Sequence, residues 1–152
     1  MKLDVAIMSQ SLREAETLAQ AAEAVGFDTL WTSETQHDPF LPLGVAALRT
    51  QRIGLGTAIA VAFARNPTSV AHLAWDLQAA SEGRFRLGLG TQVQAHIERR
   101  FGMPWGPPAA RLREFILALR AVWDAWQTGG RLNFRGEYYK LTLMAPFFNP
   151  GP

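Results

Sequence analysis

The sequence predicts an α/β fold: a parallel (β/α) half of a TIM barrel with about four βα units, followed by a C-terminal helix and a small hairpin. Short apolar strands alternate along the chain with segments of helical periodicity. Right-handed crossovers between such strands produce a parallel sheet. The chain has 152 residues, whereas a closed (β/α)8 barrel needs about 250. We therefore expect one incomplete barrel domain over residues 1–152.

Composition narrows the possible partners. Charged residues make up 18% of the chain, a low share that suggests cover of some apolar surface by another chain. The longest basic run is the pair Arg99–Arg100, which argues against nucleic-acid binding. Cysteine is absent, so disulfides and thiolate metal sites are excluded, and we predict no metal. We also expect no membrane span and a cytoplasmic location, because neither a long apolar run nor a signal peptide is evident.

The first βα unit has clear boundaries. Leu3–Met8 is typical of a short buried strand, and Ser11 with Glu14 forms a capping-box pattern that starts a helix. Gly26 is the natural end of that helix. A second strand is predicted at 27–32, only two or three residues later, as is common in αβ connections.

A polar segment, Ser33–Phe40, follows the second strand directly and contains Glu34, Thr35 and His37. Loops at this end of a parallel strand commonly carry functional groups. The alternative is a solvated turn closed by Asp38-Pro39. A short helix is then expected at 41–48.

The stretch from Arg52 to Pro67 is the centre of the predicted fold. Its first part is a buried strand, Ile53–Ile59, in which two glycines allow close approach by a neighbouring layer or a ligand. A loop is predicted at Ala60–Arg65. Asn66 is a favourable N-cap, and Pro67 suits the first helical position. A core strand with small-residue packing remains the alternative interpretation.

The next βα unit resembles the previous one. A helix is predicted from Pro67 to about Glu82, and a fourth strand at Arg84–Leu89 leads into the turn Gly90–Gln92. A short helix at Val93–Phe101 carries His96. A glycine turn before a helix can present free N–H groups to a phosphate, but a plain surface helix fits these residues equally well.

The remaining chain is predicted to form a rigid connector, a long helix and a hairpin. The connector is 102–108, and the helix at 109–128 is followed by a hairpin over 131–143 that turns near Gly136-Glu137. The tail from Ala145 is expected to be irregular. The helix carries a broad apolar stripe typical of a core face: Leu112, Phe115, Ile116, Leu119, Val122, Trp123 and Trp126.

Four segments in order carry a resemblance to a known family: residues 22–31, 34–40, 56–67 and 83–91. With them the chain resembles the N-terminal half of the bacterial luciferase-like monooxygenase family, in the branch that uses the deazaflavin coenzyme F420. The resemblance implies a TIM barrel that holds F420, or alternatively FMN, at its C-terminal mouth. It implies an oxidoreductase that transfers a hydride between this coenzyme and a small organic substrate.

The same resemblance implies site residues. A non-proline cis peptide is expected at Ala58–Ile59, in a bulge that backs the coenzyme ring. Glu34 and His37 are the candidate catalytic residues. The implied coenzyme contacts are Thr35, Thr57, Ala58, Ile59, Gly90, Thr91 and His96.

Two departures from the family pattern affect the proton-transfer roles. Thr35 stands where some deazaflavin dehydrogenases place a catalytic histidine, which leaves His37 as the candidate. Gln92 and Val93 stand where some members carry an acid. The half of the barrel that supplies much of the phosphate binding is also missing.

Two other functions compete with a complete enzyme. One is an inactive half-barrel that acts only as a homodimer or together with a complementary chain, since its first and fourth strands would be bare edges. The other is a phosphate-handling aldolase or isomerase. That activity would favour a buried lysine or a Glu/His pair at strand ends, and the only lysines, Lys2 and Lys140, are badly placed for it.

Overall fold

The computed structural model describes residues 1–151 and divides into two compact units. The first unit comprises Met1–Val61 and Leu73–Gly90. The second comprises Ala62–His72 and the described residues from Thr91 onward. Helix α3 (Pro67–Ala80) begins in the second unit and ends in the first.

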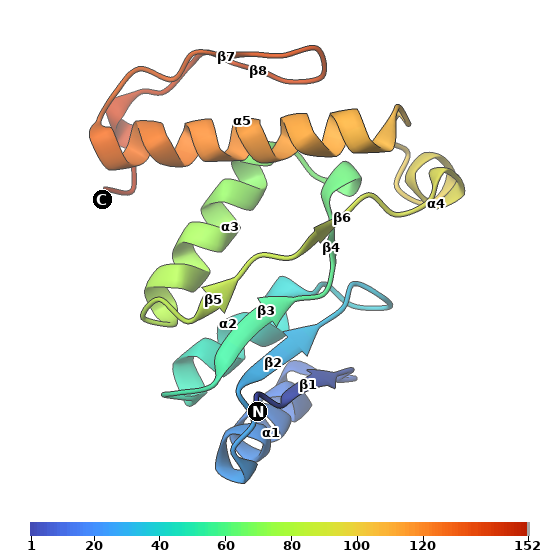
Figure 1. Cartoon of the computed structure of the whole chain (residues 1–152), viewed down its shortest axis with the longest axis vertical. Helices are drawn as coiled ribbons and strands as arrows, with labels where there is room; N and C mark the ends of the chain where they lie inside the picture. The colour runs from blue at the N-terminus through green and yellow to red at the C-terminus, as the bar shows by residue number, and fades with distance from the viewer. Residues whose placement is uncertain (152) are drawn as a thin grey trace. The chain divides into compact units, whose positions relative to one another are not determined.

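A four-stranded parallel sheet in the order β1-β2-β3-β5 forms the centre of the first unit (Figure 1). Helices alternate with the strands along the chain, so the predicted α/β class is confirmed. The elements in chain order are β1 (Asp4–Ile7), α1 (Leu12–Val25), β2 (Thr29–Thr32), α2 (Phe40–Arg49), β3 (Gly54–Thr57) and β5 (Phe85–Arg86).

The two faces of this sheet differ, because side chains alternate along each strand. Leu30, Leu55 and Phe85 share one face, and all three are buried. Helices α1 and α2 lie against the sheet (Figure 1). The opposite face carries one row across the strands: Ala6, Trp31, Gly56 and Arg86. A Cβ on Gly56 would lie 2.3 Å from the Trp31 ring, so the indole lies directly over this glycine.

Side chains far apart in sequence fix the connections at the other end of the sheet. The Glu23 carboxylate on α1 accepts the N–H groups of Gln51, Arg52 and Ile53 at 2.6 to 3.1 Å. The Arg84 guanidinium donates to the carbonyls at the end of α2, including Thr50 O at 2.9 Å. The Arg84 bonds satisfy carbonyls that the end of α2 leaves free, and the Glu23 bonds satisfy the N–H groups of the turn that follows.

The third and fourth strands are each interrupted, and the interruptions lie opposite each other. After the break, β4 (Ala60–Val61) pairs in parallel with β6 (Leu89–Gly90) in a separate two-stranded sheet. The three residues 57–59 therefore lie opposite only two residues of the fourth strand, 87 and 88. One extra residue on one strand is the arrangement of a β-bulge, which bends the strand and re-aims its side chains. The Ala58–Ile59 peptide bond in this bulge is cis, as the resemblance implied.

Four predictions of element boundaries were wrong, three of them at these irregular places and one in the tail. The third strand ends at Thr57, and the expected loop at 60–65 contains β4 and the 3-10 helix η1 (Ala62–Ala64). The predicted fourth strand is split into β5 and β6, and the tail contains a 3-10 helix, η2 (Pro146–Phe148). The Ala60 N–H donates to Gly88 O at 2.9 Å. This long-range pairing leaves no periodic signal in either segment.

Helix starts and ends follow the predicted signals closely. The Ser11 hydroxyl accepts the Glu14 N–H at 3.1 Å, and the Asn66 side chain accepts the Ser69 N–H at 2.9 Å. Gly26 takes a left-handed conformation with φ of 97° at the end of α1. One detail differs from a capping box, because the Glu14 carboxylate accepts the Gln10 N–H.

In the second unit, the long helix α5 (Pro108–Thr128) presents the predicted apolar stripe to the interior. Its buried members include Phe115, Leu119, Val122 and Trp126. The buried Arg111 guanidinium lies 4.3 Å from the Phe63 ring centroid and donates to the Tyr139 hydroxyl at 3.2 Å. This one side chain therefore ties η1 and the hairpin to α5.

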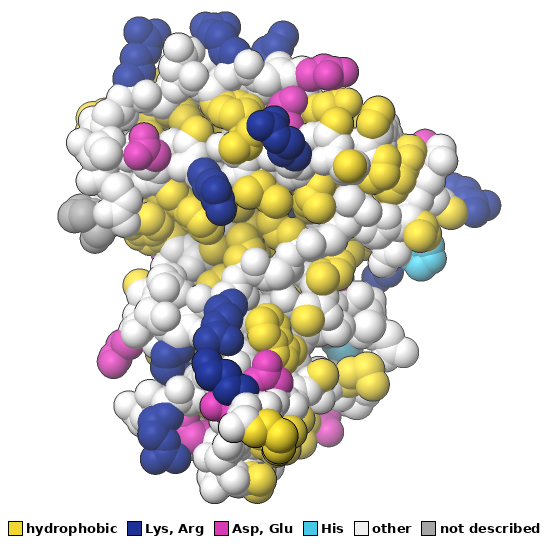
Figure 2. Space-filling model, viewed as in Figure 1, with side chains coloured by type: hydrophobic (Ala, Val, Ile, Leu, Met, Phe, Trp, Pro, Cys, Tyr) yellow, Lys and Arg dark blue, Asp and Glu magenta, His cyan; other side chains and the backbone are white. Residues whose placement is uncertain are grey.

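The predicted hairpin is present as β7 (Phe134–Arg135) and β8 (Lys140–Leu141), and α4 (Gln94–Arg99) precedes α5. The Glu114 carboxylate on α5 accepts the N–H groups of Tyr138 and Tyr139, each at 2.7 Å. Basic side chains gather over the hairpin (Figure 2). They are exposed, so this face of the hairpin is solvated.

Candidate functional site

The end of β2 is fastened to the break in the third strand. The Ala58 N–H donates to Thr32 O at 2.7 Å, and the Ser33 hydroxyl donates to Ala58 O at 2.7 Å. Both bonds cross from one parallel strand to its neighbour at their carboxyl ends, where ligand sites gather in α/β folds. The bulge is therefore held in one position relative to the loop after β2.

Glu34 holds the other side of the same bulge. Its backbone N–H donates to Ile59 O at 3.1 Å, and its carboxylate accepts the Val61 N–H at 2.7 Å. Hydrogen bonds to a carboxylate are stronger than those between neutral groups. Glu34 thus bonds to Ile59, a residue of the predicted coenzyme contact, through its backbone, and to Val61 just beyond it through its side chain.

Thr57 is fully buried at this break and bonds to the fourth strand. Its hydroxyl donates to Gly88 O at 2.7 Å and accepts the Gly88 N–H at 2.9 Å. A Cβ on Gly88 would lie 2.0 Å from Thr57 O, so the close approach requires glycine. The Thr57 hydroxyl is engaged in this pairing, which leaves its backbone as the group for the predicted coenzyme contact.

Ala58 and Ile59 are exposed at the bulge, with 36% of the Ile59 side chain accessible. Gly90 of β6 lies beneath this isoleucine, because a Cβ there would be 2.9 Å from Ile59 Cδ1 and Cγ1. Ala58 and Ile59 form an apolar step at the carboxyl-terminal end of the sheet, which we call the Ala58–Ile59 step. A flat, partly apolar ring can lie against such a surface.

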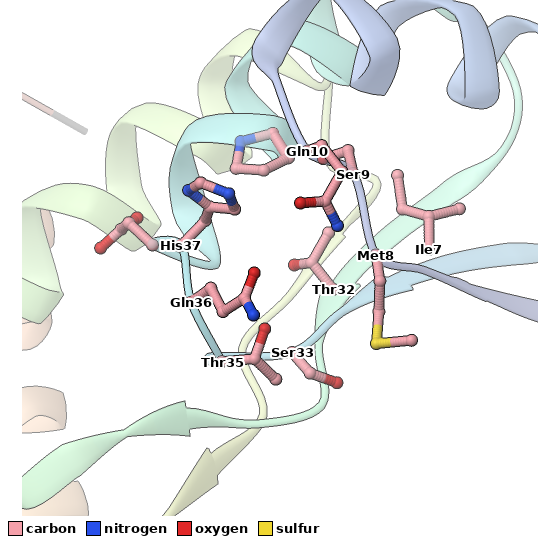
Figure 3. Close-up of a pocket in the computed structure, with 11 residues that line it drawn as sticks. Ile7, Met8, Ser9, Gln10, Thr32, Ser33, Thr35, Gln36 and His37 are labelled. Carbon is pink, nitrogen blue, oxygen red and sulfur yellow. The ribbon is translucent and has the colours of Figure 1, made fainter.

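A hollow of about 300 Å³ lies between the segments that follow β1 and β2. Residues from the two segments face each other across it (Figure 3). Thr35, Gln36 and His37 line it and are exposed. The full lining is Ile7, Met8, Ser9, Gln10, Thr32, Ser33, Thr35, Gln36, His37, Asp38 and Pro42.

The residues after β1 were missed in the sequence reasoning. Met8, Ser9 and Gln10 follow the first strand just as Ser33 and Glu34 follow the second. The rule that focused attention on the second loop, that polar residues at a strand's carboxyl end carry function, applies equally to the first. The same criterion, applied to the sequence, would therefore have included Met8, Ser9 and Gln10 in the candidate site.

Most of the predicted site residues lie in the first unit: Glu34, Thr35, His37, Thr57, Ala58, Ile59 and Gly90. Thr91 and His96 belong to the second unit. The Thr91 hydroxyl donates to Gln92 O at 3.0 Å, and His96 is exposed on α4. Their coenzyme contact stays a prediction.

Two other kinds of feature are absent from residues 1–151, the part of the chain that the structure describes. No described helix is long and apolar enough to cross a membrane. Within the same residues, no group of three His, Asp or Glu side chains is arranged to hold a metal ion.

Comparison with known proteins identifies the family. The family model described as luciferase-like monooxygenase matches residues 2–152. The chain belongs to this family. A Mycobacterium tuberculosis protein described as uncharacterized is 58% identical to this luciferase-like chain over all 152 residues, which cover 44% of that protein.

Two further relatives carry functional descriptions. A putative coenzyme F420-dependent oxidoreductase of M. tuberculosis is 38% identical over 127 residues, 83% of this luciferase-like chain and 36% of the relative. An F420-dependent glucose-6-phosphate dehydrogenase of Mycobacterium avium is 35% identical over 144 residues, 85% of this chain and 42% of the relative. The chain thus spans less than half the length of these relatives.

Solved structures support the fold. The oxygenating constituent of 3,6-diketocamphane monooxygenase from Pseudomonas putida, in complex with FMN, matches with a TM-score of 0.81 at 18% identity. The match covers 95% of the luciferase-like chain and 45% of that protein. The F420-dependent tetrahydromethanopterin reductase of Methanopyrus kandleri matches with a TM-score of 0.75 at 24% identity, over 92% and 44% of the two chains. The half-barrel predicted from sequence therefore corresponds to part of known luciferase-like barrels.

Proposed function

We propose that this chain forms the coenzyme-facing part of an oxidoreductase that passes a hydride between F420 and a small organic substrate. FMN is the alternative coenzyme. The observation that carries the proposal is the Ala58–Ile59 step, which is apolar and exposed, and whose two carbonyls accept hydrogen bonds from the Ser33 hydroxyl and the Glu34 N–H. The F420-dependent descriptions of the two relatives support the choice of coenzyme.

The residues at the step would suit one face of a tricyclic ring, with the hollow left beside it. A Cβ at Gly90 would collide with Ile59, so the glycine lets the isoleucine lie flat at the sheet edge. Ala58 and Ile59 would back the ring, and Thr35 would contact its polar edge. When bound, the coenzyme would supply or accept the hydride.

His37 is the residue that we assign to proton transfer. Oxidation of an alcohol to a carbonyl removes a hydride from carbon and a proton from oxygen, so a base is needed within hydrogen-bond reach of the hydroxyl. His37 is exposed, lines the hollow and belongs to the same loop as Glu34. The Glu34 carboxylate already accepts the Val61 N–H, which gives it a positioning role in this proposal.

A coenzyme titration tests the proposal. F420 and FMN are added separately to the chain, and binding is read from quenching of coenzyme fluorescence. We expect saturable binding of at least one of them. Ile59→Ser removes apolar contact area from the step and should weaken that binding about tenfold.

Leu48→Ser is the matched control for this titration. Leu48 is 72% exposed on α2 and lies outside the hollow lining, so its substitution should leave coenzyme affinity unchanged. Absence of binding by both coenzymes, or equal losses in the two variants, would contradict the assignment.

A second candidate is an assembly in which this chain acts only together with another. Within the described residues, β1 and β5 each pair with a single neighbour. The sheet face with Ala6 and Arg86 is exposed, whereas parallel sheets are ordinarily covered on both faces. A homodimer or a complementary chain would cover this face and pair the bare edges.

A further inference from the structure

The polar groups around the hollow are nearly all uncharged. Among the eleven lining residues, hydroxyls come from serines and threonines and amides from Gln10 and Gln36, with the His37 imidazole beside them. The Ser33 and Thr32 hydroxyls donate to Ala58 O and Pro39 O, so toward a ligand they can only accept. The two side-chain amides both donate and accept hydrogen bonds. They therefore complement a ligand group that does the same, such as an alcohol, or one that only accepts, such as a ketone.

The single carboxylate in the lining, Asp38, occupies the place where an anion would be expected to bind. Asp38 Oδ1 accepts the N–H groups of Phe40 and Leu41, at 2.8 and 3.2 Å, in the first turn of α2. A helix N-terminus favours negative charge, and here the protein's own carboxylate supplies it. A second anion in the hollow would meet Asp38 as a like charge.

We propose that this hollow binds the uncharged alcohol or carbonyl end of the substrate and discriminates against carboxylates and phosphates. The proposal rests on the function proposed above and specifies the substrate class of that site. The reacting carbon would lie between the segment after β1 and the segment after β2. Any anionic group of the same substrate would lie outside the hollow.

The test uses one methionine as a reporter. Met8 lines the hollow and is 75% exposed, while the other three methionines, Met1, Met103 and Met144, lie outside the lining. The full chain is labelled with [methyl-13C]methionine and titrated separately with cyclohexanone and with cyclohexanecarboxylate, two probes that share a ring and differ in charge. We expect a saturable Met8 shift with cyclohexanone, and at least tenfold weaker binding of the carboxylate.

A charge insertion supplies the matched pair of variants. Gln36→Lys places a cation at the hollow, and Gln127→Lys places one on an exposed position of α5. We expect Gln36→Lys to strengthen cyclohexanecarboxylate binding at least fivefold, and Gln127→Lys to leave it unchanged. A carboxylate preference in the wild-type chain, no Met8 response to either probe, or equal effects of the two lysines would overturn the proposal.

Repeating the titration with F420 present separates this proposal from the coenzyme assignment. Simultaneous binding of F420 and cyclohexanone supports a substrate site beside the coenzyme. Displacement of cyclohexanone by F420 overturns it, because the coenzyme's own hydroxylated chain would then fill the hollow. If the chain does not change the fluorescence of F420 while Met8 still responds to cyclohexanone, the coenzyme proposal is wrong and the ligand class of the hollow is supported.

Discussion

At the scale of single residues, Glu34 shows how one side chain can be assigned two different roles. The family resemblance suggests a catalytic group, whereas the structure has its carboxylate accept the Val61 N–H and its backbone bond to Ile59. A positioning role needs only an acceptor at that point. A proton-transfer role needs an ionisable group.

Substitution of Glu34 separates these roles. Glu34→Gln keeps a carbonyl oxygen for the Val61 N–H, so we expect F420 affinity within about twofold of the wild type. Glu34→Ala leaves that N–H unsatisfied, at a cost of about 1–3 kcal/mol, and should lower the affinity about tenfold or more. Fluorescence titration measures both, with Glu16→Ala on α1 as the control. A catalytic Glu34 would instead leave the Gln variant able to bind F420 and unable to turn over substrate.

Two glycines allow a matched test of close packing. Gly88→Ala would put a Cβ 2.0 Å from Thr57 O, and we expect it to lower the free energy of unfolding by about 1–3 kcal/mol. Gly44→Ala lies inside α2, where the nearest atom would be 3.9 Å away. This change should stabilise the chain by about 1 kcal/mol because alanine favours helix. Urea denaturation measures both changes, and a neutral Gly88→Ala would contradict the geometry of the break.

At the scale of elements, the carboxylate of Glu23 links α1 to the turn before β3. Burial raises the pKa of Glu23, but hydrogen bonds from Ile53, Arg52 and Gln51, together with the charge of Arg52, lower it more. The net result is a pKa below the ordinary value of 4.5. The proton is therefore bound more weakly in the folded chain than in the unfolded one, and folding is favoured by the ionised form.

The pH dependence of stability follows from this sign. The contribution of Glu23 is fully present above its unfolded pKa of about 4.5 and is lost as the pH falls through the lower folded pKa. We expect Glu23→Gln to be less stable than the wild type at pH 7, with the difference shrinking below pH 4.5. Urea unfolding at a series of pH values measures this. A difference that stays constant to pH 3 would show that the charge contributes nothing.

The elements also show what could be predicted from sequence. Strands β1 and β2 and the starts of α1 and α3 were correct within a few residues, because caps and apolar runs are local signals. The bulge at Ala58–Ile59 was expected from the family resemblance alone, and the facing break in the fourth strand was missed, because it depends on contacts between Thr57 and Gly88, 31 residues apart. In the site, the loop after β2 was predicted from its polarity. The anchoring of Glu34 to Val61 could not be, since no local pattern records a bond across 27 residues.

At the scale of the whole molecule, the exposed sheet face leads to a prediction about association. We expect the chain to form dimers at micromolar concentration in light scattering, with a melting temperature that rises with concentration. Ala6→Lys adds a charge to the exposed row and should weaken the dimer. Ala24→Lys, on an exposed position of α1, should not. A monodisperse monomer with a concentration-independent melting temperature would exclude self-association as the way this face is covered.

The extra residue at the break between β3 and β4 has a consequence for how this edge tolerates change in evolution. Three residues there oppose two on the neighbouring strand. Deleting one of these three residues would let both strands continue as an uninterrupted ladder. Ile59, if kept, would then no longer lie in a bulge. Point substitutions would preserve the backbone of the Ala58–Ile59 step, whereas a single-codon deletion would remove the step and leave most of the hydrophobic interior unchanged.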